Sequence, residues 1–277
     1  MKFVPLGVCW EITSLCNYKC PFCYAKKEKI LSLTFEQQKR VLDILKKQGT
    51  RYISFTGGEP LFVRRIDDLM VYAKNLGFFV KLCTNGSMLT KQFVEKVKNS
   101  LDMISLPLDG STDKIIKKIR GEKNHFSKFI RAMHFLSNTK IKVVINTLVT
   151  KDNGPDLINI SQILKKFPNV YEWKLLRYYY IDYEDTSYIT SKKDYLSLIS
   201  KVSKLNIPFM VVARPQARKD QSTFILLDEA GDIYVKSNHK RYLRGNIFKH
   251  NLKKSLMNSR YFSKELHMKK YAKYSKP

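Results

Sequence analysis

Hydrophobic and polar positions follow two alternating patterns along the first two thirds of the chain. Short runs rich in β-branched and aromatic residues predict strands, and runs with apolar residues at helical spacing predict helices between them. The predicted strands cover residues 8–13, 51–56, 78–83, 103–108, 142–150 and 172–181. The predicted helices lie within residues 34–49, 66–76, 91–98, 125–136 and 156–167.

This order of elements predicts an α/β protein, because a strand, a crossover helix and a second strand form the unit of a parallel sheet. Six such units suggest most of a β/α barrel, which is a partial (β/α)6 TIM-like barrel. We expect this core in residues 1–185. Residues 186–277 are then expected to be a C-terminal extension that closes the barrel.

Three of the five cysteines, Cys16, Cys20 and Cys23, fall within eight residues directly after the first predicted strand. Thiols this close together indicate a metal site, although a chance grouping in a loop is the alternative. Zinc would need a fourth Cys or His nearby, and the next cysteine, Cys83, is sixty residues further on. An iron-sulfur cluster held by three thiolates keeps one iron open, which favours a catalytic cluster over an electron-transfer cluster.

A second motif, Gly57-Gly58-Glu59-Pro60, follows the second predicted strand. It is therefore expected at the edge of the sheet where barrels place their active sites. Two glycines let the backbone approach a ligand closely, and Glu59 could accept a proton or a hydrogen bond. A glycine pair on its own is more often a simple turn.

The cysteine spacing, with the aromatic Phe22 just before the third cysteine, and the GGEP motif together resemble the signatures of the radical S-adenosylmethionine (SAM) superfamily. The resemblance implies an open partial barrel of six parallel strands, one 4Fe-4S cluster on the three cysteines, and SAM on its free iron. It also implies that an external electron donor drives cleavage of SAM to a 5′-deoxyadenosyl radical, which abstracts hydrogen from a substrate.

The same resemblance implies a set of residues that contact SAM. Alternation along the fourth predicted strand places Ser105 and Asp109 on one face. Asn85-Gly86 and Asp109-Gly110 could each also be plain turns. The implied cofactor-binding residues are Phe22, Gly57, Gly58, Glu59, Pro60, Asn85, Ser105 and Asp109.

Short segments across the chain are similar to viperin and its prokaryotic relatives, which carry one cluster and convert a nucleoside triphosphate to its 3′-deoxy-3′,4′-didehydro form. The segments are residues 16–20, 119–125, 143–147, 173–174 and 217–229. Carried over by residue, the resemblance implies that Arg120 and Lys174 face the triphosphate and that Asn146 faces the nucleotide. No cysteine follows Cys83, so an auxiliary cluster is not expected.

Three departures from the viperin pattern bear on the substrate. Viperins have cations where this chain has Tyr52, Val144 and Glu172. Charge-assisted bonds contribute roughly 1.5 to 3 kcal/mol each, so losing three of them should weaken triphosphate binding strongly. Either the basic tail supplies replacements, or the substrate is not a triphosphate. RNA, a peptide or another metabolite remain alternative substrates, and a noncatalytic iron-sulfur module is the non-enzyme alternative.

The formal net charge is +27, and residues 236–277 contribute 13 Lys or Arg and a single acidic residue, Glu265. Such a tail attracts phosphate on a small molecule or on RNA, although it could equally be a solvated surface. No run reaches the roughly 18 to 20 apolar residues of a membrane span, and the N-terminus shows no cleavable signal. We therefore expect a cytoplasmic protein, a location that suits reduced thiols.

Overall fold

The computed structural model describes residues 3–23, 32–178, 189–215, 222–237 and 240–274. Two sequence predictions extend beyond these ranges. Residues 179–181, the end of the sixth predicted strand, and residues 217–221, within a segment similar to viperin, lie outside the described residues.

The strands form one sheet in the order β10-β9-β8-β1-β2-β3-β4-β5-β6-β7. Neighbouring strands from β8 to β7 in this order are parallel, and β9 and β10 are antiparallel. The six predicted strands are present as β1 to β6, and the sheet continues with two further parallel strands, β7 and β8. The strands are β1 (Gly7–Thr13), β2 (Tyr52–Gly57), β3 (Phe79–Cys83), β4 (Met103–Pro107), β5 (Lys142–Val149), β6 (Val170–Arg177), β7 (Met210–Arg214), β8 (Ile225–Leu227), β9 (Asp232–Ser237) and β10 (Lys240–Asn246).

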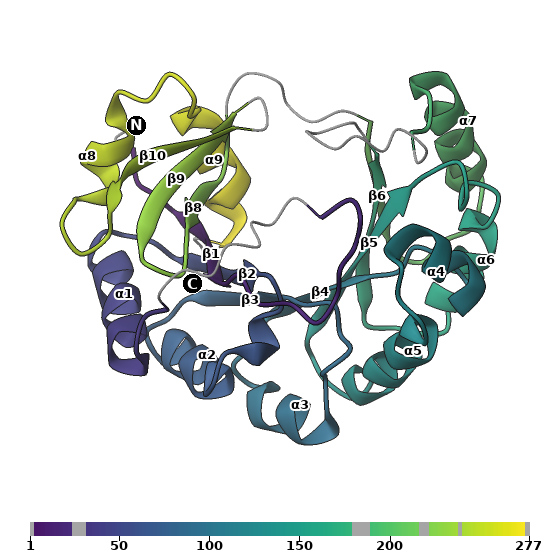
Figure 1. The fold of residues 1–277 in the computed structure, drawn as a ribbon, viewed down its shortest axis with the longest axis horizontal. Helices are drawn as coiled ribbons and strands as arrows, with labels where there is room; N and C mark the ends of the chain where they lie inside the picture. Colours follow the sequence, from purple (N-terminus) through teal and green to yellow (C-terminus); the bar gives the residue numbers. More distant parts are fainter. Residues whose placement is uncertain (1–2, 24–31, 179–188, 216–221, 238–239, 275–277) are drawn as a thin grey trace.

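The helices between the parallel strands lie in an arc outside the curved sheet (Figure 1). This arrangement confirms the α/β prediction, and in the described residues no pairing joins β7 to β10 to close the sheet. The α-helices are α1 (Phe35–Lys47), α2 (Ile66–Asn75), α3 (Lys91–Val97), α4 (Asp113–Arg120), α5 (His125–Leu136), α6 (Leu157–Leu164), α7 (Lys192–Ser203), α8 (Leu252–Met257) and α9 (Lys264–Tyr271). The 3-10 helices are η1 (Pro60–Phe62) and η2 (Ala272–Tyr274).

Local signals explain both the predicted and the unpredicted helices. Helix α1 begins with a capping box. The Thr34 hydroxyl accepts from the backbone N–H of Gln37, and the Gln37 side chain accepts from the N–H of Thr34. Helix α4 was not predicted, although Thr112 caps its start and Gly121 ends it in the left-handed region. Length alone does not explain the omission, since the predicted helix α3 has only seven residues and α4 has eight.

The two faces of the sheet differ in chemistry. Ile53 and Phe55 of β2 belong to the apolar core together with Val41 and Leu45 of α1. Ser54 lies between them and therefore points to the opposite, inner face. Strand alternation and register place the polar or sulfur-containing residues Cys9, Lys81, Cys83, Ser105, Asn146 and Lys174 on this inner face, together with the apolar residues Met103, Pro107 and Val144. The inner face is therefore mainly polar, whereas the helix-covered face is apolar.

Aromatic side chains pack together where β2 and β3 begin. Tyr52 and Phe79, the first residues of these strands, stack with ring centroids 5.6 Å apart. Tyr271 lies 4.9 Å from the Tyr52 ring, and Tyr274 lies 4.8 Å from the Tyr52 ring and 4.5 Å from the Phe79 ring. We call these four residues the aromatic floor. The C-terminal helix therefore covers the N-terminal end of the inner face.

Candidate active site

We call residues 14–23, which carry Cys16, Cys20 and Cys23, the cysteine loop. This loop follows β1 and crosses the C-terminal ends of the strands (Figure 1). All three of its cysteines are free; Cys16 is exposed, Cys20 is buried and Cys23 is half-buried. Burial raises the pKa of the Cys16 thiol, and it raises the pKa of Cys20 to about 11. A bound metal would have to displace these thiol protons.

N–H groups surround the sulfur atoms. The backbone N–H of Tyr18 donates to Cys16 Sγ over 3.4 Å, and Asn85 Nδ2 lies 3.9 Å from the same sulfur. Arg120 Nη1 lies 3.7 Å from Cys20 Sγ. Donors to sulfur stabilise the thiolate form, which is the form that binds iron.

The three free thiols on one loop are donors of the kind that an iron-sulfur cluster takes. Within the ranges that the structure describes, no three His, Cys, Asp or Glu side chains are grouped closely enough to hold one metal ion. A cluster binds each thiolate through a different iron, so its ligands stand farther apart than those of one ion. Cys16, Cys20 and Cys23 would hold the cluster.

The two glycines of GGEP allow the motif to lie against the cysteine loop. A Cβ at Gly57, whose φ is +131°, would lie 2.3 Å from the carbonyl oxygen of Thr13, and one at Gly58 would lie 2.2 Å from that of Leu15. The N–H of Gly58 donates to Thr13 O, and the N–H of Glu59 donates to Leu15 O, each over 2.7 Å. Only glycine permits this approach of one backbone to another.

Glu59 is fully buried and ties GGEP to the loop after β3. Its Oε1 accepts from the N–H of Leu61 at 3.1 Å and from the hydroxyl of Thr84 at 2.6 Å, and its Oε2 accepts from the N–H of Asn85 at 2.7 Å. Burial raises the pKa of Glu59, and these three donors oppose the rise. The adjacent Pro60, also buried, is the first residue of η1.

Asn85 lies directly beside the cysteine loop. Its Nδ2 donates to Asn17 Oδ1 over 2.9 Å, and its Oδ1 accepts from the N–H of Ser87 at 2.9 Å. Ser105 is buried on β4, and its hydroxyl accepts from Asn146 Nδ2 at 2.7 Å. The predicted SAM residue Ser105 and the predicted substrate residue Asn146 are therefore in contact.

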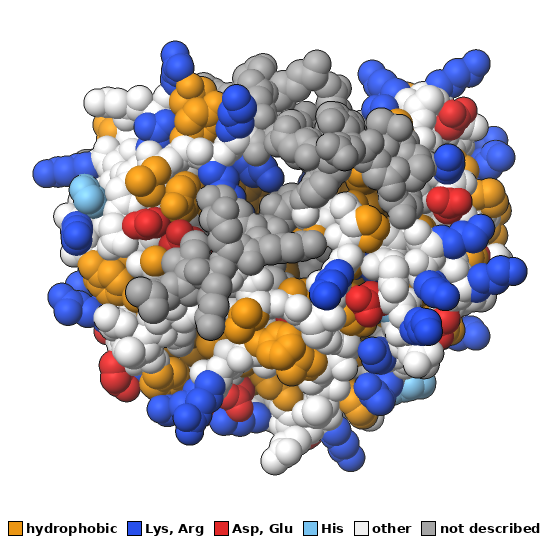
Figure 2. All heavy atoms as spheres, in the orientation of Figure 1, with side chains coloured by type: hydrophobic (Ala, Val, Ile, Leu, Met, Phe, Trp, Pro, Cys, Tyr) orange, Lys and Arg blue, Asp and Glu red, His pale blue; other side chains and the backbone are white. Residues whose placement is uncertain are grey.

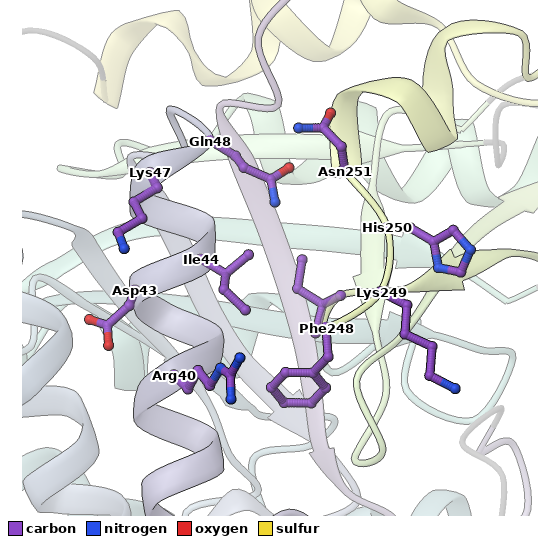
Figure 3. A pocket seen from close by; sticks show the side chains of 10 residues that line it. Arg40, Asp43, Ile44, Lys47, Gln48, Phe248, Lys249, His250 and Asn251 are labelled. Carbon is purple, nitrogen blue, oxygen red and sulfur yellow. The ribbon is translucent and has the colours of Figure 1, made fainter.

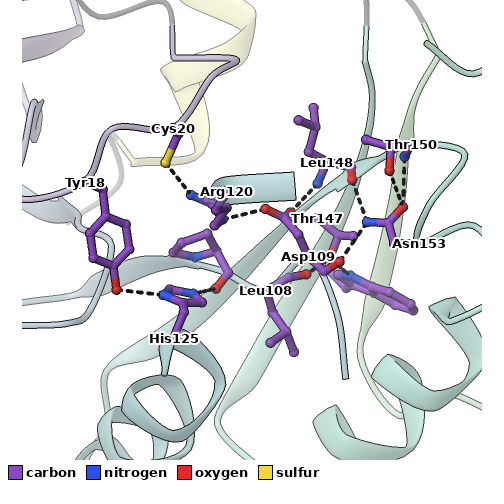
Figure 4. A network of polar contacts seen from close by, with 12 residues as sticks. Tyr18, Cys20, Leu108, Asp109, Arg120, His125, Thr147, Leu148, Thr150 and Asn153 are labelled. Atoms are coloured by element: carbon purple, nitrogen blue, oxygen red, sulfur yellow. Dashed lines mark hydrogen bonds and ion pairs between the residues drawn. The ribbon is translucent and has the colours of Figure 1, made fainter. Parts of the chain in front are cut away.

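Asp109 and Arg120 form a buried ion pair at the centre of a polar network (Figure 4). Arg120 Nε lies 2.5 Å from Asp109 Oδ2, and Asp109 Oδ1 accepts from the N–H of Leu148 at 2.7 Å. Burial raises the pKa of Asp109, and the charge of Arg120 opposes this effect. The guanidinium also lies 5.2 Å from the ring of Phe22. Arg120 thus joins Asp109, Phe22 and Cys20.

His125 continues the network beneath the cysteine loop (Figure 4). Its Nδ1 lies 3.0 Å from the hydroxyl of Tyr18, and its Nε2 lies 3.1 Å from the carbonyl oxygen of Pro107. Because a carbonyl only accepts, Nε2 carries the proton and Nδ1 accepts from Tyr18. Burial lowers the pKa of His125 to about 4, so the ring is neutral at physiological pH.

Two of the three predicted substrate residues come together. Asn146 of β5 and Lys174 of β6 are partners in register on the inner face, and Lys174 Nζ lies 3.2 Å from Glu172. Burial lowers the pKa of Lys174, and the charge of Lys81 adds to this effect. Among the described residues Arg120 forms no hydrogen bond or ion pair with Asn146 or Lys174. Its predicted role at a substrate phosphate stays a prediction.

Two interior cations, Lys81 of β3 and Lys270 of α9, were not singled out from the sequence. Lys81 could have been found, because it alternates with Cys83 on a strand whose other residues are apolar. Lys270 carries no comparable signal, since it is one of many lysines in the basic tail.

Two surface features lie apart from this site. A cavity of about 490 Å³ opens between α1 and residues 247–251, and none of its lining residues belongs to the site (Figure 3). Lys and Arg side chains are distributed around the visible face of the molecule (Figure 2). Among the described helices, none combines the length and apolar character that a membrane span requires.

Comparison with known proteins gives both a family and a fold. The sequence profile of the radical SAM superfamily matches residues 10–162. The chain is 31% identical to the Fe-coproporphyrin III synthase of Methanosarcina barkeri over 59% of its own length, and it spans only 42% of that relative. It is 26% identical to the S-adenosylmethionine-dependent nucleotide dehydratase of Flammeovirga pacifica over 80% of both chains. The crystal structure of Streptococcus suis SuiB bound to S-adenosylmethionine matches with a TM-score of 0.75 at 17% identity, covering 95% of this chain and 68% of SuiB.

Proposed function

Because the chain belongs to the radical SAM superfamily, we propose that it abstracts hydrogen from a phosphorylated small molecule, with a nucleoside triphosphate as the leading candidate. When bound, one 4Fe-4S cluster supplies the electron that splits SAM into methionine and a 5′-deoxyadenosyl radical. An external donor must provide that electron. For a nucleotide substrate, the proposed reaction is the viperin-like dehydration of the ribose.

In this proposal the residues of the chain bind and orient the reactants. Cys16, Cys20 and Cys23 hold the cluster, and the loop held in place by Glu59 presents backbone groups to SAM. Arg120 lies beside Cys20 and offers positive charge at that edge of the site. The cysteine loop covers one end of the inner face and the aromatic floor covers the other. Such enclosure limits the access of water to a reactive radical.

The observation that carries the nucleotide assignment is the extent of the similarity. The match to the Flammeovirga nucleotide dehydratase runs over 245 residues, whereas the match to the Fe-coproporphyrin III synthase runs over 169. The first therefore extends well beyond the 153-residue span of the superfamily profile. Asn146 and Lys174, the residues implied for a nucleotide, lie side by side on the inner face.

A second candidate is a porphyrin substrate. The synthase of Methanosarcina barkeri is the more similar of the two relatives in identity, at 31% against 26%. This candidate predicts that SAM cleavage responds to a tetrapyrrole precursor of Fe-coproporphyrin III and not to nucleotides.

The test is anaerobic reconstitution with iron and sulfide, followed by SAM, dithionite and one candidate substrate at a time. The candidates are the nucleoside triphosphates and tetrapyrrole precursors of Fe-coproporphyrin III, and 5′-deoxyadenosine is measured by mass spectrometry. We expect one nucleotide to raise its formation at least tenfold over the rate without substrate. Equal rates with every nucleotide and with none would refute the nucleotide assignment.

Two cysteine variants serve as a matched pair in this assay. Cys20→Ser should abolish cleavage because a cluster ligand is lost. Cys9→Ser makes the same chemical change on β1, outside the cysteine loop, and should retain cluster binding. Equal loss in both variants would refute the assignment of the cluster to the cysteine loop.

A further inference from the structure

The inner face of the sheet carries more positive than negative charge towards its covered end. Lys81 is only 9% exposed, and Lys174 is half-buried beside Glu172. Lys270 reaches this region from α9, and the nearby charges that act on it are those of Cys9, Lys174, Lys81 and Arg214. Among the described residues, Glu172 is the carboxylate that pairs with one of these three lysines, Lys174.

Lys270 is the least satisfied of these cations. Its Nζ is shielded from solvent and has no hydrogen-bond partner. Its contacts are aromatic, with Nζ 2.8 Å from the centroid of Phe224 and 4.9 Å from that of Tyr271. Burial, with the neighbouring charges of Lys174 and Lys81, lowers the pKa of Lys270 to about 7. A buried ammonium without a partner is costly, and a bound anion would remove that cost.

The position of these lysines fits the far end of an elongated substrate. Lys81 stands four residues before Asn85, which lies beside the cysteine loop. At about 3.3 Å per strand residue, Lys81 lies roughly 13 Å along the chain from Asn85, and Lys174 and Lys270 lie near enough for their charges to act on one another. A substrate whose reacting carbon lies near the cysteine loop could therefore extend its anionic end towards the lysines.

We propose that Lys81, Lys174 and Lys270 form a phosphate-binding site above the aromatic floor, and that it takes the phosphate groups of the substrate. This inference rests on the proposed function, because it identifies the groups that would hold that substrate. Lysines bind phosphate as mobile point charges, and several of them together suit a group with several charged oxygens. Viperins have cations at the positions of Tyr52, Val144 and Glu172, and this chain does not. Lys81 and Lys270 would then supply the positive charge that is missing there.

The test measures binding of inorganic tripolyphosphate to the cluster-reconstituted full chain by anaerobic isothermal titration calorimetry. Lys270→Met and Lys81→Met should each weaken binding by about 10- to 100-fold, as expected for loss of one charge-assisted contact. Lys269→Met is the matched control, because it removes the same charge from the exposed preceding residue of α9. It should bind like the wild type.

Three results would refute the proposed phosphate-binding site. They are wild-type affinity in both interior variants, equal loss in Lys269→Met, and equal affinity for citrate, which carries carboxylates in place of phosphates. Melting temperature separates binding from folding, since Lys270→Met removes a buried unpaired charge and should melt higher than the wild type. Tripolyphosphate binding without nucleotide-stimulated SAM cleavage would refute the nucleotide reaction alone. Nucleotide-stimulated cleavage without any effect of the interior variants would refute this site alone.

Discussion

Glu59→Gln tests whether the buried carboxylate of GGEP holds the two loops together as an ionised group. Three donors converge on its two oxygens, and among the described residues Oε2 accepts from the N–H of Asn85 alone. A glutamine that keeps the Oε1 contacts turns an NH₂ group towards that N–H. Flipping the amide does not help, because the NH₂ group would then face the backbone N–H of Leu61, which can only donate.

The magnitude follows from the one contact that must be lost. Losing a charge-assisted hydrogen bond costs about 1.5 to 3 kcal/mol, and removing a buried charge offsets part of this. We therefore expect a loss of about 2 kcal/mol in the free energy of unfolding. For a chain of this size this corresponds to roughly 3 to 4 °C in melting temperature. SAM affinity should also fall, because the loops at Glu59 and Asn85 would no longer be held together.

The assay is urea denaturation followed by circular dichroism, with SAM affinity measured by calorimetry on the reconstituted protein. Glu95→Gln makes the same substitution at an exposed residue of α3 and should leave stability close to that of the wild type. If Glu59→Gln were as stable as Glu95→Gln, the carboxylate would have to be protonated in the native state. That result would refute the ionised interaction described here.

Gly58→Ala should lower the iron bound per chain after reconstitution, because its Cβ would lie 2.2 Å from the carbonyl oxygen of Leu15 and displace the cysteine loop; unchanged iron content would contradict this. Asp109→Asn should destabilise the protein by about 3 kcal/mol in urea, since it leaves the buried Arg120 without its counter-charge; a neutral effect would show that the pair is dispensable. His267 has its pKa lowered from 6.5 to about 4 by burial, so the native state binds fewer protons than the unfolded state between these values. Its contribution to stability is thus present above pH 6.5 and lost as the pH falls towards 4, and His267→Gln should flatten the fall measured by urea denaturation across this range.

Much of the fold could be predicted because helix and strand patterns depend on residues that are close along the chain. The predicted first strand, residues 8–13, and the predicted helix at residues 125–136 match β1 and α5 closely. Both have a clear apolar period of sufficient length. Helix α7 and strand β7 were not predicted, because they follow residue 181, where the regular alternation of predicted strands and helices ends. Their length does not explain this, since the predicted strands β3 and β4 also have five residues and α7 has twelve.

Some features of the candidate site could be predicted from the sequence, and others only the structure shows. The cysteine spacing and GGEP are local signals, and the structure brings both loops and Asn85 together. It also gives Glu59 three internal hydrogen bonds, which the motif did not reveal. The pairing of Arg120 with Asp109, eleven residues apart, depends on where α4 lies against the end of β4.

The sequence by itself determined the order of strands and helices, the grouping of the three cysteines and the family, because each depends on residues that are close along the chain. Only the tertiary structure decided which distant side chains meet. Lys81 and Lys270 are separated by almost 190 residues, and they come near each other because the sheet curves and α9 packs at its N-terminal end. The physical reason is that strand alternation fixes the face of a side chain, whereas curvature and packing fix its neighbours.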